Sequence, residues 1–154
     1  MYDIFVVVLA CAAALSVLTL LMRFFFIPVM SFKPVTVGSA SKSLYYDHWK
    51  PNWVSSQANP ANRRAFVAPL SNTSLDEIDA LLATWPDMTL VTSDGPYRHY
   101  TSKTKIMGYI DDVEFKASEE GGIHVRSASR LGLRDYGANR KRVEAIRAAL
   151  ASSF

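Results

Sequence analysis

The stretch DDVEFKASEEGGIHVRSASR, residues 111–130, decides the fold. Val113 and Phe115 alternate with polar neighbours before the central loop, and Ile123 and Val125 do so after it. This period of two is typical of paired strands. The intervening SEEGG offers two glycines for the positive φ angles of a tight turn. The sequence therefore predicts an antiparallel hairpin.

The same region contains a change of phase. Within residues 105–117 the apolar alternation shifts, because Ile110 and Val113 are three positions apart. A slip of one residue moves every side chain to the other face of a sheet, so we expect a bulge or bend at Asp111 and Asp112.

The second face of the hairpin is charged. Asp112 and Glu114 alternate with the apolar side chains of one strand, and His124 and Arg126 do so on the other. We expect the acids and bases to face each other, because opposite charges on facing strands stabilise a sheet.

A helix is predicted after the hairpin, over residues 139–151, with Asn139 suited to cap its start. Its apolar stripe consists of Val143, Ile146 and Leu150. Its first turn is basic and consists of Arg140, Lys141 and Arg142. The helix dipole disfavours positive charge at that end, so these cations require nearby carboxylates or a bound anion.

Upstream, the pattern predicts one helix among short strands. Ser74 and Glu77 form a capping box, apolar residues then recur at helical spacing, and Pro86 ends the helix. The expected strands are residues 65–70, 88–92 and 97–101.

Residues 31–65 are rich in proline, serine and asparagine and predict a mostly irregular lead-in. Four aromatic residues are expected to anchor it on the core or on a bilayer surface: Tyr45, Tyr46, Trp49 and Trp53. We divide the chain into an anchor (1–30), a linker (31–50) and a soluble domain (51–154).

Residues 4–22, IFVVVLACAAALSVLTLLM, contain no charged side chain. A helix of about 20 apolar residues spans the hydrocarbon core of a bilayer. A cleaved signal peptide would need a basic segment before the apolar run, and Met1-Tyr2-Asp3 provides none. A lipoprotein site at Cys11 would leave residues 12–22 unexplained. The sequence favours a retained single-pass anchor, in a bacterial inner membrane or an organellar membrane.

The composition narrows the classes of function. The chain has 154 residues, 49% of them hydrophobic, which allows one folded domain. Its net charge of +3 is too small to indicate nucleic acid binding. It has no P-loop, dinucleotide fingerprint or Gly-x-Ser-x-Gly motif, so we expect no cofactor and no catalytic residue.

Charge is segregated near the C-terminus. Residues 111–122 carry a net charge of −4, and residues 123–154 carry +5. Three interpretations stay open. The first is an internal ion-pair network that docks the last helix, in which Asp111, Asp112 and Glu114 hold Arg126, Arg130 and Arg140.

The second interpretation is a site for a phosphate or lipid headgroup, and the third is a metal-dependent hydrolase. The metal would be held by Asp111, Asp112, Glu114 and His124, although consecutive carboxylates point to opposite faces of a strand. The candidate residues for binding an anion or a partner are Arg126, Arg130, Asn139, Arg140, Arg142, Asp112 and Glu114.

Several motifs resemble a known family. They are DDVEF at 111–115, HVRSASRLG at 124–132, the pattern Asn-Arg-x-Arg-Val-Glu-x-x-Arg from Asn139, and, upstream, NWVSSQA at 52–58. Together they are similar to the family catalogued as domain of unknown function 1499, over roughly residues 50–150. Relatives often carry a cysteine where Trp53 stands, so no role for a thiol is transferred to that position.

The resemblance and the charges disagree on the side of the membrane. Family members occur in bacteria and plastid-bearing lineages, often behind a signal or membrane segment, which implies an extracytoplasmic or lumenal domain. Arg23 and Lys33 follow the apolar run and no base precedes it, which favours the cytoplasm by the positive-inside rule. Both sides stay open.

We therefore expect an α+β fold, with one N-terminal transmembrane helix and a small domain of two helices and a mainly antiparallel sheet. The function predicted first is a non-catalytic accessory subunit of a membrane complex, respiratory and photosynthetic complexes being examples. Its expected partners are membrane lipid and other subunits of that complex, and not nucleic acid.

Overall fold

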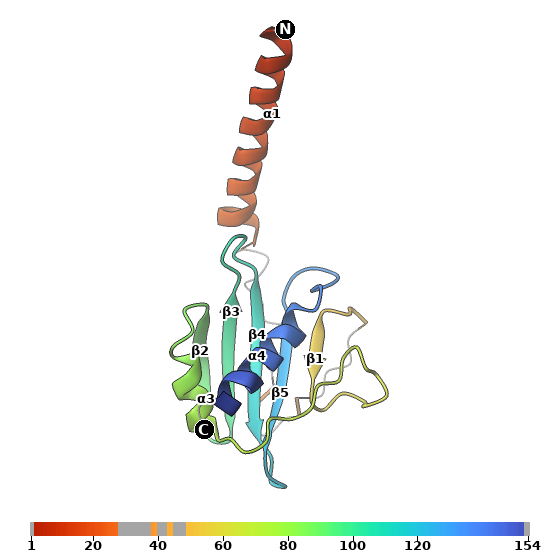
Figure 1. Ribbon diagram of the computed structural model, residues 1–154, viewed down its shortest axis with the longest axis vertical. Coiled ribbons are helices and arrows are strands. Elements are labelled where there is room, and N and C mark those ends of the chain that lie inside the picture. The colour runs from red at the N-terminus through yellow and green to blue at the C-terminus, as the bar shows by residue number, and fades with distance from the viewer. Residues whose placement is uncertain (1, 28–37, 40–42, 45–48, 153–154) are drawn as a thin grey trace.

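The computed structural model describes residues 2–27, 38–39, 43–44 and 49–152. It begins with a long helix, α1 (Tyr2–Leu21), which continues as a π-helical segment, η1 (Met22–Phe26). Figure 1 shows α1 rising from one end of a folded domain. Tyr45, Tyr46 and most of the predicted linker lie outside the described residues.

The domain is built on a five-stranded sheet in the order β1-β5-β4-β3-β2, with every neighbouring pair antiparallel. The strands are β1 (Trp53–Ser55), β2 (Met88–Asp94), β3 (Tyr97–Lys103), β4 (Ile110–Ala117) and β5 (Ile123–Ser129). Two helices accompany the sheet, α3 (Leu75–Leu82) and α4 (Ala138–Ser152). The predicted α+β architecture is confirmed.

The predicted hairpin is β4 and β5. Its turn contains Gly121 and Gly122, at φ of 95° and 82°. A Cβ atom on Gly122 would lie 3.0 Å from the carbonyl oxygen of Leu70, so both this close approach and the positive φ favour glycine beside the bridge between Leu70 and Ile123.

The bulge predicted at Asp111 and Asp112 is wrong. Strand β4 pairs without interruption with β3 and with β5, and the register shift of the sheet lies in β2, between Leu90 and Thr92. The apparent change of phase arises because Asp111 occupies a core-facing position, where an arginine of α4 binds it. At that position a polar side chain therefore does not mark the face of the sheet that is turned away from the core.

The strand predicted over residues 65–70 is also absent. This segment forms only single bridges, Phe66 to Ser55 and Leu70 to Ile123. Val67 and Leu70 are nevertheless buried in the core. The apolar pattern of this segment therefore reflects burial and not strand pairing. Pro69 has no backbone N–H to donate to a neighbouring strand, so it interrupts regular pairing.

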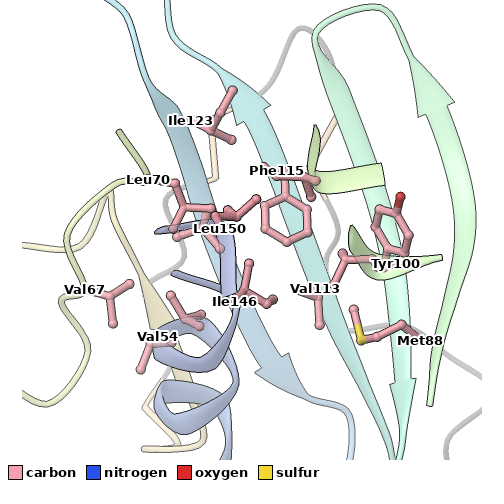
Figure 2. Close-up of a cluster of buried hydrophobic side chains, with 14 residues drawn as sticks. Val54, Val67, Leu70, Met88, Tyr100, Val113, Phe115, Ile123, Ile146 and Leu150 are labelled. Carbon is pink, nitrogen blue, oxygen red and sulfur yellow. The ribbon is translucent and has the colours of Figure 1, made fainter. Parts of the chain in front are cut away.

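Helices α3 and α4 pack on one face of the sheet and enclose the main hydrophobic core. Figure 2 shows Phe115 and Val113 of β4 meeting Ile146 and Leu150 of α4. Phe115 also contacts the ring of Tyr100 edge-on, at 6.0 Å between centroids.

The starts of the two helices differ. The capping box of α3 is confirmed, since Ser74 and Glu77 exchange hydrogen bonds through side chain and backbone. Helix α4 begins one residue earlier than predicted, and Asp135 takes the capping role, accepting from the backbone N–H of Asn139 at 2.9 Å. The Asn139 side chain therefore does not cap the helix, and it points into the domain.

Candidate functional site: two buried polar clusters

The face of the sheet turned away from the helices carries a buried ionic layer. Positions two apart on a strand share a face, and six polar side chains from β3, β4, β5 and the residue after β5 point to this one. The layer consists of Tyr97, His99, Asp112, Glu114, Arg126 and Arg130. Asp112 and Glu114 are 0% exposed, and Arg126 is 2% exposed.

Glu114 is the centre of the first half of this layer. It lies directly opposite Arg126 in the β4–β5 register, and the two side chains form an ion pair. The other carboxylate oxygen accepts from the Tyr97 hydroxyl at 2.7 Å and from the backbone N–H of Gly38. The carboxylate is therefore satisfied by one cation and two neutral donors.

Asp112 organises the second half in the same way. Arg130 donates to it through Nε and Nη2, at 3.0 and 2.7 Å, in a bidentate arrangement. His99 Nε2 lies 2.8 Å from Asp112 Oδ1 on the other side. Each carboxylate thus stands between an arginine, Arg126 within β5 or Arg130 directly after it, and an aromatic polar side chain of β3.

The electrostatics follow from these contacts. Burial by itself would raise the pKa of Asp112, but the hydrogen bonds from His99 and Arg130 outweigh it, and the pKa lies below its usual value of 3.8. Burial, together with the negative charge of Glu114, raises the pKa of the Tyr97 phenol far above its usual value of 10. Tyr97 is therefore a hydrogen-bond donor at every physiological pH.

Part of the lead-in covers this layer. Leu44 is 0% exposed, and its carbonyl oxygen accepts from the Ser55 hydroxyl of β1 at 3.1 Å. A Cβ atom on Gly38 would lie 2.8 Å from Leu44 Cδ2 and 3.1 Å from Glu114 Oε1. Position 38 therefore favours glycine, because a side chain there would press on Leu44 and on the carboxylate.

A second polar cluster lies on the helix side of the sheet, centred on Asn139 of α4. Its amide is fully buried and donates to the Asn52 carbonyl oxygen at 2.9 Å, while its oxygen accepts from Ser127 at 2.6 Å. Arg142 donates to Ser127 at 2.8 Å and forms an ion pair with Asp111 at 2.7 Å. This cluster joins α4 to β4, β5 and the residue before β1.

The remaining predicted base, Arg140, meets no carboxylate of β4. Its guanidinium donates to the carbonyl oxygens of Arg63, Arg64 and Phe66, which fastens α4 to the 63–66 segment. The interpretation as an internal ion-pair network is therefore confirmed with one change of partner: Arg142, and not Arg140, pairs with Asp111.

The predicted residues do not converge on one point. Arg126 and Arg130 lie with Asp112 and Glu114 on one face of the sheet, whereas Asn139 and Arg142 lie on the other. A single anion therefore cannot bridge Arg126, Arg130 and Arg142.

The proposed metal ligands are also dispersed. Asp111 and Asp112 lie on opposite faces, and His124 lies opposite Lys116 with its Nδ1 3.2 Å from the Ser56 hydroxyl. Within the described ranges, no three His, Cys, Asp or Glu side chains gather in a way that would hold a metal ion.

Sequence reasoning missed Tyr97 and His99, which complete the ionic layer. Their spacing of two places both on one face of β3. The choice of face and of partners depends on the β3–β4 register, however, which no local pattern encodes. Asn52, which binds α4 across 87 positions of sequence, was missed for the same reason.

The fold and these clusters define a small α+β domain with a charged interior, carried behind an apolar N-terminal helix. The chain belongs to the family described as "Protein of unknown function (DUF1499)", whose profile matches residues 43–150. No curated protein and no solved structure is significantly similar to the chain.

Proposed function

We propose that the chain is a single-pass membrane protein whose domain serves as a non-catalytic interaction subunit of a larger membrane complex. The observation that carries the proposal is the surface of the N-terminal helix. Residues Ile4–Phe26 are apolar except for Arg23 and long enough to cross a bilayer, and the most apolar part of that span is not buried against the domain. Lipid or the apolar helices of other subunits would cover this surface.

The state of the buried charges supports a scaffolding role. Each of the three buried carboxylates of β4 has its own arginine: Asp111 has Arg142, Asp112 has Arg130 and Glu114 has Arg126. A general acid or base needs access to a substrate and a proton. These groups instead hold strands and α4 together.

The outer edge of the sheet supports an interaction role. Strand β2 is an edge strand, and in the part of the chain that the structure describes no strand pairs with its outer side. Leu90 and Val91 on this edge are 47% and 54% exposed. An open edge with apolar side chains is a surface on which another chain adds a strand.

The test is the size of the particle that the full chain forms when native membranes are dissolved in a mild detergent. We expect a defined complex, with the same partner at a constant ratio through purification. The double variant Leu90→Lys/Val91→Lys should weaken it, and Glu119→Lys, on the exposed β4–β5 turn, should not. Migration of the unmodified chain only as a free monomer would contradict the proposal.

A further inference from the structure

The end of the domain nearest α1 is formed by two loops. The β3–β4 loop, residues 104–109, contacts the anchor directly, since Arg23 of η1 donates to the Ile106 carbonyl oxygen. The β5–α4 loop, residues 130–137, lies beside it, and Tyr109 and Leu133 line one common hollow. Figure 1 shows both loops at the end of the sheet from which α1 rises.

Both loops expose apolar side chains at their tips. Ile106 is 75% exposed, Leu133 is 55% exposed and Tyr136 is 91% exposed. Tyr136 also adopts φ of 51°, a conformation that bulky residues rarely take, and it does so with its ring in solvent. Single exposed apolar residues are ordinary, but three at one end, beside an apolar helix, form a patch.

Bases outnumber acids around these tips. A groove of about 480 Å³ between η1 and the β3–β4 loop is lined by three of them, Arg23, Lys103 and Lys105, and by one carboxylate, Asp87. Arg134 lies on the second loop beside Leu133. The opposite end of the domain is acidic, because the β4–β5 turn carries Glu119 and Glu120 (Figure 1).

We infer that this end of the domain is a membrane-facing surface that lies on anionic lipid headgroups. We define it as the apolar tips Ile106, Leu133 and Tyr136 with the bases Lys103, Lys105 and Arg134. The apolar tips enter the interface while the bases meet lipid phosphates, as in peripheral proteins that combine both signals. Phe24 lines the same groove and is 63% exposed, as expected for an aromatic side chain at the level of the membrane–water interface.

This inference rests on the proposed anchor, so the experiment reports on both. The full chain, with Cys11→Ser, is reconstituted into vesicles of neutral lipid or of neutral lipid mixed with phosphatidylglycerol. An environment-sensitive fluorophore is attached to one new cysteine at a time, from Ile106→Cys, Leu133→Cys, Glu119→Cys or Leu15→Cys. Quenching by lipids that carry a shallow or a deep nitroxide gives the depth of each label.

We expect shallow quenching at positions 106 and 133, none at 119 and deep quenching at 15. The shallow quenching should increase with phosphatidylglycerol and fall in a Lys103→Glu/Lys105→Glu background, since each lysine near an anionic surface contributes about fivefold to binding. Unquenched labels at 106 and 133 with a quenched label at 15 would overturn the inference and leave the anchor in place. An unquenched label at 15 would overturn the anchor itself. Equal quenching in neutral and anionic vesicles would overturn the assignment to anionic lipid.

Discussion

The replacement Glu114→Gln tests the ionic layer most severely, because it removes one charge and changes almost no volume. Glu114 is 0% exposed and accepts hydrogen bonds from Arg126, Tyr97 and Gly38. Glutamine offers one carbonyl oxygen in place of two carboxylate oxygens, so its amide would face one of these donors. Arg126, 2% exposed, would lose its counter-charge.

The expected loss of stability is large. Removal of one partner from a buried ion pair costs about 3–5 kcal/mol, because the other charge stays buried after it loses that counter-ion. A small domain is stable by only about 5–15 kcal/mol, so the variant should lose a substantial part of its free energy of unfolding. The same substitution at Glu144 provides a matched control. Glu144 pairs with Arg147 at 3.0 Å but is 47% exposed, and such pairs contribute about 0–1 kcal/mol.

The assay is urea unfolding of the full chain in a mild detergent, followed by tryptophan fluorescence. Trp53 is 7% exposed in the folded domain and becomes exposed on unfolding. The midpoint and slope of each transition give the free energy of unfolding. A loss for Glu114→Gln no larger than that for Glu144→Gln would refute the reasoning, because Glu114 would then act as a surface charge.

Three further predictions use the same unfolding assay or a titration. The replacement Asn139→Ala should cost about 1–3 kcal/mol, because the buried Ser127 hydroxyl loses its acceptor and the Asn52 carbonyl oxygen loses one of its two donors; a loss well below about 1 kcal/mol would contradict the role given to Asn139. The pKa of Asp112 is lowered in the folded chain, so the unfolded chain binds a proton more readily. The stability that Asp112 contributes is therefore complete above its usual pKa of 3.8 and should fall as the pH drops through the folded-state pKa. An unfolding midpoint in urea that does not change between neutral and acidic pH would contradict this. The pKa of Tyr97 is raised in the folded chain, so its contribution to stability should be complete below about pH 10 and decline above it. Burial and the hydrogen bond to Asp79 also raise the pKa of Tyr100. Absorbance at the phenolate band should therefore show at least two more tyrosines titrating with the accessible set in the unfolded chain than in the folded chain, and Tyr97→Phe should reduce that difference by one.

Local chemistry was sufficient to predict much of the fold. The capping box at Ser74 and the glycine turn of the β4–β5 hairpin each depend on residues within a few positions of one another, whereas the helix expected to run to Pro86 ends already at Leu82. The stripe Val143, Ile146 and Leu150 of α4 is fully contained in one helix, and all three side chains are buried as expected. Such features are specified by spacing alone.

The errors arise where polar groups are buried. Asp111 faces the core, where it pairs with an arginine of α4 that lies 31 positions away in the sequence. The alternation of polar and apolar residues therefore predicts the wrong face for Asp111. The opposite face of β4 was read as polar but is 0% exposed at Asp112 and Glu114. Only the pairing of β3 with β4 brings Tyr97 and His99 to these carboxylates, and pairing between strands is not encoded in either strand by itself.

The most direct test of the account is the intact mass and location of the chain after native membranes are washed at alkaline pH. A retained anchor predicts that the protein stays in the membrane pellet with residues 4–26 still attached to the domain. A mature chain that begins beyond residue 30, or a full-length chain released into the wash, would contradict the anchor and the functions built on it.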